Sequence, residues 1–336
     1  MCGIVGKLNL AQEPIDEALV RRMCALSAHR GPDDEGVYMN RHVALGIRRL
    51  SVIDVATGGQ PQSNEDGKTW IVGNGEIYNF RDLRAELVRK GHRFTTQSDT
   101  EVIVHLYEEM GERCVERLNG MFAFAIWDER QQRMVLARDR LGQKPLHYAL
   151  TGEGLTFASE IPPILEDPAV EREIELRALH QYLRLKYVPG PLTMFNGVNK
   201  LPPAHMMICE NGHTSLEQYW DVDYSRKLNL TEEEWEERVL ALLQDAVRLR
   251  LVTDMPLGAL LSGGIDSSLI VSLMQQSTEH PIKTFSIGFE AQSHNELPYA
   301  RQVAEHVGAD YHEEFVRPDA VDVLPTLVQH YGEPFG

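Results

Sequence analysis

The chain has 336 residues, more than one hydrophobic core usually supports, so we expect two domains. Its 43% hydrophobic and 25% charged residues are ordinary for a globular protein. The 33 basic and 50 acidic side chains give a formal net charge of −17. This charge argues against a nucleic-acid partner, because phosphate contacts need clustered lysine and arginine. Any anionic substrate must be held by local donors.

The four cysteines, Cys2, Cys24, Cys114 and Cys209, lie far apart and form no CxxC or Cys/His pattern. Their spacing therefore indicates neither a zinc site nor a disulfide framework. No charged and apolar leader precedes Cys2, and the longest apolar run, 121–127, is too short to cross a bilayer. We expect a cytoplasmic protein without a membrane partner.

In the first half of the chain, short strand patterns alternate with amphipathic helices. Apolar residues at helical spacing predict a helix over 15–26, and a second helix over 81–90 ends at Gly91. Ser98 and Glu101 have the spacing of a capping box that opens a helix to Met110. The strand patterns fall at 4–10, 43–47, 70–72, 122–127 and 134–137. Strands that follow one another through turns favour antiparallel sheet with helices packed outside.

The order of predicted elements changes after a proline-rich connector at 162–203, which surrounds one helix pattern at 176–186. The polar stretch 221–231 precedes an amphipathic helix with Trp235, Val239, Leu242, Leu243, Val247 and Leu251 on one side. Strand and helix patterns then alternate at 257–261, 267–276, 283–289 and 298–307. This alternation predicts a parallel sheet with helices on its faces. We expect domains at 2–220 and 231–336, the second truncated because no element closes the pattern before Gly336.

Cys2 follows the initiator Met1 directly, so removal of one methionine would leave a thiol and a free α-amine on one residue. An α-amine has a pKa of about 7.7 to 8.0, and about a tenth of it is neutral near pH 7. It can therefore take the thiol proton, as in enzymes with a catalytic N-terminal threonine. This arrangement predicts a nucleophile that carries its own base.

Other segments provide groups that suit an amino-acid amide. The run Gly73-Asn74-Gly75-Glu76 follows an apolar strand and offers a side-chain amide and a backbone N–H for an oxyanion, although Asn-Gly is also common in tight turns. Arg49 could bind a carboxylate through its planar guanidinium. Asp99 could receive an ammonium group or cap a helix.

Five ordered segments of the first domain resemble the class II glutamine amidotransferases: 1–6, 29–33, 49–51, 74–79 and 98–99. The resemblance implies an N-terminal-nucleophile hydrolase fold of the αββα type, with Cys2 as nucleophile and its freed amine as base. It implies an oxyanion hole from the Asn74 side chain and the Gly75 N–H. It also implies glutamine contacts from Arg49, Leu50, Val52, Asn74, Gly75, Glu76 and Asp99. For His29 and Arg30 we derive no chemical step and expect a role in shaping the pocket.

The strand pattern 257–261 runs into Ser262-Gly263-Gly264-Ile265-Asp266-Ser267-Ser268. A glycine turn at a helix N-terminus suits phosphate, and Asp266 could hold Mg²⁺ against it. Transfer of a γ-phosphate is disfavoured, because the lysine of the GxxxxGK[ST] motif is missing. The string resembles the pyrophosphate loop of ATP pyrophosphatases, which cleave between the α and β phosphates. That resemblance implies a partial α/β ATP-pyrophosphatase domain.

Together the two domains resemble the glutamine-hydrolysing asparagine synthetases, including the segment 137–146. The resemblance implies glutamine, aspartate and ATP as substrates with Mg²⁺, and the products asparagine, glutamate, AMP and pyrophosphate. It implies ATP contacts from Leu261, Ser262, Gly263, Gly264, Asp266, Ser267 and Ile287. The chain departs from the family at His147, where a tyrosine is usual, and lacks the later Ser-Gly-(Asp/Glu)-Gly segment.

Several alternatives stay open at this point. The acceptor could be another carboxylate, the chain could act as a glutaminase alone, or a β-lactam-synthetase-like ligase or a non-enzymatic binding module could carry the same segments. The sequence leaves the oligomeric state open, with a homodimer as one option. We expect this chain to release ammonia from glutamine and to form no pyrophosphate from ATP and aspartate.

Overall fold

The computed structural model describes residues 1–289, 295–316 and 320–334, with only the backbone of Ala320 and Val321. The chain divides into two compact units, Met1–Val222 with Leu324–Gly336, and Asp223–Val323. The expected end of the second domain at Gly336 lies outside the described residues, as do its positions 290–294 and 317–319.

The first unit contains two six-stranded antiparallel sheets. One sheet consists of β1 (Gly3–Asn9), β2 (Asp34–Asn40), β3 (Val43–Arg49), β8 (His147–Leu150), β9 (Gly154–Ala158) and β10 (Val198–Lys200). The other consists of β4 (Gln62–Ser63), β5 (Thr69–Ile77), β6 (Gly120–Asp128), β7 (Arg133–Arg138), β11 (His205–Glu210) and β12 (His213–Gln218). Their strand orders are β10-β8-β9-β1-β3-β2 and β12-β11-β7-β6-β5-β4.

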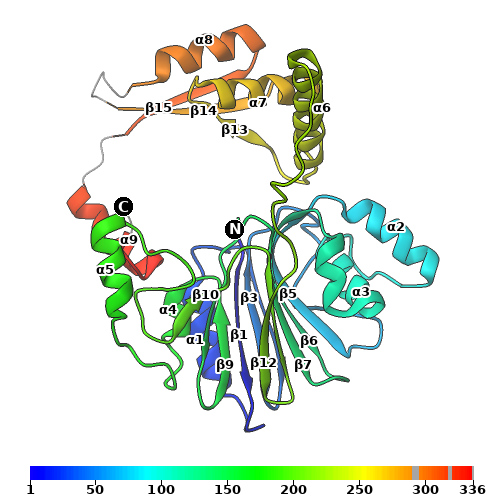
Figure 1. Cartoon of the computed structure of the whole chain (residues 1–336), viewed down its shortest axis with the longest axis vertical. Coiled ribbons are helices and arrows are strands. Elements are labelled where there is room, and N and C mark those ends of the chain that lie inside the picture. The colour runs from blue at the N-terminus through cyan, green and yellow to red at the C-terminus, as the bar shows by residue number, and fades with distance from the viewer. Residues whose placement is uncertain (290–294, 317–319, 335–336) are drawn as a thin grey trace. The chain divides into compact units, whose positions relative to one another are not determined.

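The helices of the first unit are α1 (Glu17–Leu26), α2 (Phe80–Lys90), α3 (Glu101–Met110), the 3-10 helix η1 (Gly111–Arg117), α4 (Ile161–Ile164), α5 (Leu176–Leu185) and the last part of α9 (Ala320–Tyr331). Figure 1 shows α1 and α4 on one side of the two sheets and α2 and α3 on the other. The order of layers is therefore helix, sheet, sheet, helix, which confirms the predicted αββα fold.

The alternating directions of successive side chains along the strands explain these layers. Ile4 and Leu8 of β1 enter the core between the sheets together with Trp127, whereas Val5 packs outward in the cluster that holds Met23 of α1. Successive residues of a strand point to opposite faces, so a strand that is apolar at every position must be covered on both sides. All seven residues of β1 are buried.

The capping box predicted from Ser98 and Glu101 is wrong. The helix α3 begins at Glu101, and no side chain caps its N-terminus. The Glu101 carboxylate instead accepts hydrogen bonds from the backbone amides of Thr95 and Thr96 at 2.6 and 2.8 Å. The Ser98 hydroxyl accepts from the Thr100 amide at 3.1 Å. Local turn contacts in the segment before the helix displaced the expected cap.

The second unit contains a parallel sheet in the order β13-β14-β15, as predicted. Its elements are α6 (Glu232–Arg250), β13 (Gly258–Leu260), α7 (Ile265–Gln276), β14 (Lys283–Gly288), α8 (Leu297–Val307) and β15 (Asp310–Phe315). The side chains of β14 alternate strictly between buried and exposed. On the exposed face, Leu260, Phe285 and Ile287 are 78%, 43% and 53% exposed.

The helix α6 confirms the predicted helix but buries less of its apolar side than its pattern indicates. Val247 is buried against Met274 of α7, whereas Trp235 and Leu242 remain exposed. In the described part of the chain, no helix combines the length and apolar character needed to span a membrane.

Candidate active site

The thiol of Cys2 lies at the start of β1, beside the end of β3. The antiparallel register pairs Gly3 with Arg48, which brings Cys2 next to Leu50. The Leu50 amide donates to the Cys2 sulfur, with 3.4 Å between nitrogen and Sγ. Burial raises the pKa of the Cys2 thiol, although the hydrogen bond from Leu50 acts in the opposite direction. The thiol therefore needs a base to become a nucleophile at neutral pH.

The segment 29–33 holds the backbone of Cys2 in place. Arg30 Nε donates to the Cys2 carbonyl oxygen at 2.9 Å, and its Nη1 donates to Glu160 at 2.8 Å. His29 Nε2 lies 2.9 Å from the other oxygen of Glu160. A Cβ at Gly31 would lie 2.2 Å from the Arg48 carbonyl, so only glycine fits there. Arg30 therefore binds the Cys2 backbone directly, whereas His29 contacts the Glu160 carboxylate that also pairs with Arg30.

Asn74 and Gly75 lie inside the nine-residue strand β5 and not in a tight turn. Asn74 is 2% exposed, and its Nδ2 has no hydrogen-bond partner among the described residues. A buried amide donor without a partner costs about 1 to 3 kcal/mol, which a native structure rarely leaves uncompensated. A Cβ at Gly75 would lie 2.1 Å from the Met121 carbonyl oxygen, so this position also requires glycine.

Glu76 and Asp99 bring two carboxyl groups into one buried site. Burial raises the pKa of Glu76, and the charge of Asp99 raises it further, while the charge of Lys144 opposes this shift. Burial also raises the pKa of Asp99, although its Oδ2 accepts a hydrogen bond from the Ile77 amide at 2.7 Å. Two desolvated carboxylates that repel each other are stabilised by an added cation. The arrangement suits a ligand that carries an ammonium group.

Arg49 is buried, and its guanidinium donates to the backbone carbonyls of Ile53 and Asp54 at 3.1 and 2.6 Å. Its charge acts on both the Cys2 thiol and the Asp99 carboxyl. Leu50 is 36% exposed, and Val52 is half-buried in the same segment. The loop thus presents one fixed positive charge near the thiol and the carboxylates.

Lys144 is a charged residue of this site to which sequence reasoning gave no role. It is 7% exposed, and burial lowers the pKa of its ammonium group while the charge of Glu76 raises it. Its charge also acts on Cys2. The only signal in the sequence was its place in the segment 137–146, which carried the family resemblance without an assigned function.

In the second unit, the predicted phosphate loop follows β13 and opens α7. The hydroxyls of Ser262 and Ser267 lie 3.0 Å apart, and Gly264 is the N-terminal cap residue of α7. Gly263 has φ +81°, and a Cβ there would lie 2.5 Å from the Ala300 nitrogen, so only glycine fits. Asp266 is exposed in the first turn of the helix.

Several predicted nucleotide residues line one pocket of about 340 Å³ at the carboxyl edge of the parallel sheet. Leu261, Ser262, Ser267 and Ile287 are among its lining residues. Ligands of open α/β sheets usually bind outside the carboxyl ends of the strands. The position of the pocket agrees with that rule.

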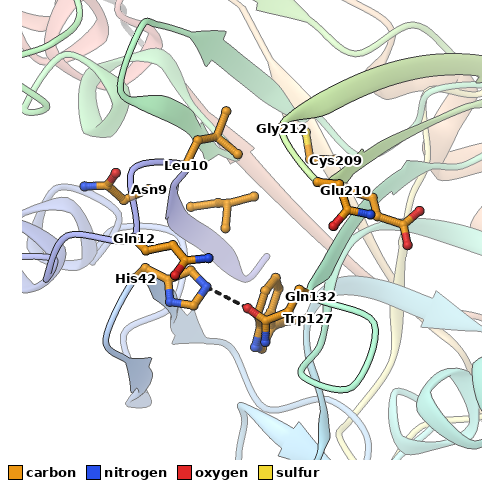
Figure 2. Close-up of a pocket in the computed structure, with 11 residues that line it drawn as sticks. Asn9, Leu10, Gln12, His42, Trp127, Gln132, Cys209, Glu210 and Gly212 are labelled. Carbon is orange, nitrogen blue, oxygen red and sulfur yellow. Dashed lines mark hydrogen bonds between the residues drawn. The ribbon is translucent and has the colours of Figure 1, made fainter.

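A separate pocket of about 210 Å³ lies at the far end of β1 from Cys2 (Figure 2). Leu8, His42, Trp127 and Cys209 are among its lining residues, and His42 Nε2 lies 3.0 Å from the Gln132 side-chain oxygen. No residue predicted for either site lines this pocket. The thiol of Cys209 is therefore remote from the candidate active site.

Comparisons with known proteins agree with both halves of the chain. The glutamine amidotransferase domain family matches residues 1–220, and the asparagine synthase family matches residues 238–336. Asparagine synthetase (glutamine-hydrolyzing) 1 of Bacillus subtilis (strain 168) is 39% identical over 99% of this chain and 53% of the relative. Putative asparagine synthetase (glutamine-hydrolyzing) 2 of Methanocaldococcus jannaschii is 34% identical over 100% of this chain and 69% of the relative.

Among solved structures, the allosteric regulatory enzyme of purine biosynthesis matches with a TM-score of 0.50 and 18% identity, over 95% of this chain and 69% of that one. Residues 1–220 thus form a glutamine amidotransferase domain with the αββα fold. The chain belongs to the glutamine-hydrolysing asparagine synthetase family. It spans 53% and 56% of the length of the two B. subtilis synthetases numbered 1 and 3.

Proposed function

We propose that the domain at 2–220 hydrolyses glutamine at Cys2, and that the domain at 231–336 contributes the ATP-binding edge of an asparagine synthetase. The observation that carries this proposal is the buried Nδ2 of Asn74, which has no hydrogen-bond partner among the described residues and lies on the strand that also carries Gly75 and Glu76. Such a donor fits an oxyanion that forms only during the reaction.

The first half-reaction begins after removal of Met1. The freed α-amine of Cys2 takes the thiol proton, and the sulfur attacks the side-chain carbonyl carbon of glutamine. The oxygen becomes negative and accepts hydrogen bonds from Asn74 Nδ2 and the Gly75 N–H. The C–N bond then breaks, and ammonia leaves with the proton held by the amine. Water, activated by the same amine, hydrolyses the thioester to glutamate and free Cys2.

The charges around the thiol hold the head group of glutamine. Glu76 and Asp99 receive its α-ammonium, because that cation offsets the repulsion between the two carboxylates. The buried positive charge of Arg49 stabilises its α-carboxylate. Leu50 and Val52 complete the wall of the pocket. The nearby charge of Lys144 further favours the thiolate over the thiol.

The second half-reaction belongs to the whole synthetase, in which ATP binds at the loop 262–267 with Leu261 and Ile287 beside it. Aspartate attacks the α-phosphate, the bond to the β-phosphate breaks, and pyrophosphate leaves. Ammonia then displaces AMP from the β-aspartyl adenylate to give asparagine. Mg²⁺ characteristically binds one or two carboxylates together with substrate phosphates, and the exposed carboxylate of Asp266 beside the loop fits that pattern. The ion would neutralise phosphate charge.

We further propose that the enzyme works in the cytoplasm on glutamine, aspartate and ATP, where its four free cysteines stay reduced. A different acceptor carboxylate would leave the glutaminase half unchanged. That alternative is distinguished by comparing aspartate with other carboxylates as triggers of AMP formation by the whole protein.

The decisive experiment measures glutamate release from glutamine by the purified chain and by Cys2→Ala. We expect Cys2→Ala to fall to the uncatalysed background, because the thiol forms the only covalent bond to substrate. Cys209→Ala removes a thiol at the far end of β1 and should retain activity. Mass spectrometry should find Met1 removed from the active protein. Release by Cys2→Ala within a few-fold of the parent would place the nucleophile elsewhere.

A further inference from the structure

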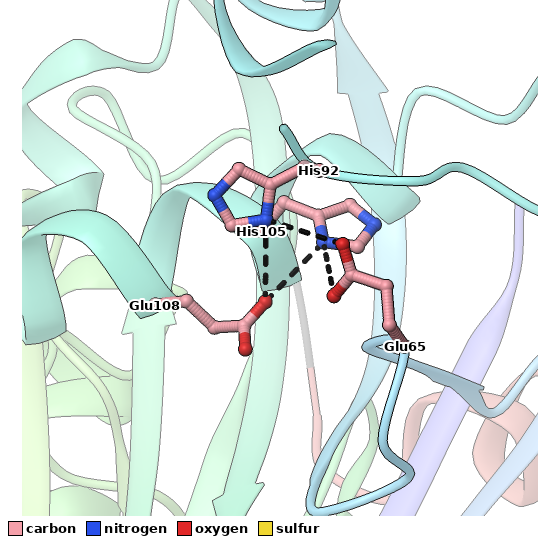
Figure 3. Close-up of side chains that lie close together, drawn as sticks. All are labelled: Glu65, His92, His105 and Glu108. Atoms are coloured by element: carbon pink, nitrogen blue, oxygen red, sulfur yellow. Dashed lines mark hydrogen bonds and ion pairs between the residues drawn. The ribbon is translucent and has the colours of Figure 1, made fainter. Parts of the chain in front are cut away.

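Four side chains outside the active site converge on one point in the first unit (Figure 3). Glu65 comes from the turn between β4 and β5, His92 from the segment after α2, and His105 and Glu108 from one face of α3. One nitrogen or oxygen of each residue lies within 4.8 Å of the others. Three separate segments of the chain therefore supply this cluster.

The distances inside the cluster are those of ligands around a small cation. His92 Nδ1 lies 3.4 Å from Glu65 and 3.6 Å from Glu108. His105 Nδ1 lies 3.5 Å from Glu65 and 3.3 Å from Glu108. The 3.3 Å contact between His105 and Glu108 also meets the criteria of a hydrogen bond, whereas the other three exceed the usual range of about 2.7 to 3.2 Å. Zinc bonds of about 2.0 to 2.2 Å in a tetrahedron place ligand atoms about 3.3 to 3.6 Å apart.

A further carboxylate orients His92, whose Nε2 lies 3.1 Å from Glu109. His105 Nε2 faces the buried carboxylate of Glu101 at 3.7 Å, beyond hydrogen-bond distance. Both imidazoles thus turn Nδ1 toward the cluster and Nε2 toward a carboxylate, the pattern common in metal sites.

The carboxylate ligands are fixed in the same way. Asn64 Nδ2 donates to Glu108 Oε1 at 2.6 Å, which leaves Oε2 directed at the two histidines. The Arg93 amide donates to Glu65 Oε1 at 2.7 Å. These hydrogen bonds hold the side chains in position before any ion binds, so binding loses little side-chain freedom.

We propose that Glu65, His92, His105 and Glu108 bind one zinc ion. Two carboxylates and two neutral imidazoles give a neutral complex with a divalent cation, and imidazole ligands favour zinc over magnesium or calcium. His105 is fully buried, and an ion at its Nδ1 provides the positive charge that the surrounding carboxylates require. Four protein ligands leave no open position, so the site is structural and not catalytic.

The zinc would fasten the segment that carries Asp99. The Glu101 carboxylate, next to His105, holds the amides of Thr95 and Thr96, and Asp99 lies between these residues and α3. A metal that fixes His92 and α3 would therefore fix both ends of the segment that places Asp99 in the glutamine site.

The test titrates zinc into chelator-treated protein and measures binding by calorimetry, with cobalt as a spectroscopic probe. We expect one zinc per chain, a higher melting temperature with zinc, and the visible absorption of tetrahedral Co²⁺. His92→Gln and Glu65→Gln replace partly exposed ligands and should weaken zinc binding by about 100-fold or more, since removal of an outer partner alone costs about 10- to 100-fold.

Two controls separate this site from other effects. His42→Gln removes a histidine outside the cluster and should bind zinc like the parent. Glu109→Gln, which changes only the partner of His92, should weaken zinc binding by about 10- to 100-fold. Absence of stoichiometric binding, or equal affinity in His92→Gln and the parent, would show that the cluster is an ion-pair network. Glutamate release by metal-free protein tests the glutaminase separately.

Discussion

The two units of this chain differ in how deeply they bury the residues of their candidate sites. In the first unit, Asn74 on β5 and Asp99 in the turn before α3 are buried, at 2% and 5% exposure. In the second unit, one sheet face exposes Leu260, Phe285 and Ile287, and the loop residues Ser262, Gly264 and Asp266 are exposed. Parallel sheets are ordinarily covered on both faces. Burial raises the pKa values of Cys2, Glu76 and Asp99 in the first site. In the second site, the backbone conformation at Gly263 sets the geometry of the loop.

The difference agrees with the functions that we propose for the two sites. An oxyanion hole and a nucleophile gain strength when water is excluded, because charges interact more strongly in a medium of low polarity. A phosphate loop acts mainly through backbone N–H groups and a helix N-terminus, which need correct geometry more than burial.

Asn74→Ala should lower the turnover of glutamine by about 10² to 10³, because one oxyanion donor is lost. Steady-state glutamate release, normalised to folded protein, measures this effect. Asn79→Ala is the matched control, since its Nδ2 already donates to the Arg117 carbonyl at 2.9 Å and should leave turnover per folded molecule unchanged. A purely structural Asn74 would lower thermal stability without changing turnover.

Gly263→Ala should weaken ATP binding by about tenfold or more and leave glutamate release intact. The added Cβ meets the Ala300 nitrogen at a positive φ, so the loop must shift away from its phosphate-binding geometry. Equilibrium dialysis with labelled ATP measures the affinity. Gly152→Ala, where a Cβ meets no atom within 4 Å, is the matched control. Unchanged ATP affinity in Gly263→Ala would separate the loop from the nucleotide site.

The KM for glutamine should rise as the pH falls. In the range where the site must lose one proton before glutamine binds, the rise should be about tenfold for each pH unit. Burial raises the pKa of Glu76 to about 8 and that of Asp99 to about 6, so the pair gains protons as the pH falls from about 8 to about 6. The protonated pair attracts the ammonium of glutamine less. Initial rates measured across pH should show this rise in KM for the parent and for the control variant Glu129→Gln. The rise in KM should be weaker for Glu76→Gln. A flat KM in the parent contradicts the assignment.

Sequence reasoning predicted the strands that carry the first site because their apolar patterns are strong and local. It also predicted the glycines of both sites, since turns and close approaches leave few other residues possible. It was wrong about the cap at Ser98, where Thr95 and Thr96 compete for the Glu101 carboxylate. It assigned no role to Lys144, because nothing near it in sequence indicates that its ammonium lies close to Cys2 and Glu76.

Sequence patterns alone predicted the αββα class, the alternating second unit, the family and the reactive thiol at position 2. These features depend on periodicity and on short motifs, which are properties of neighbouring residues. The folded structure was needed to show that Asn74 Nδ2 has no hydrogen-bond partner in the described part of the chain, that Arg30 binds the Cys2 carbonyl, and that Glu65 meets His92 and His105. Such contacts join segments far apart in the chain, and their distances are set by sheet pairing and helix packing.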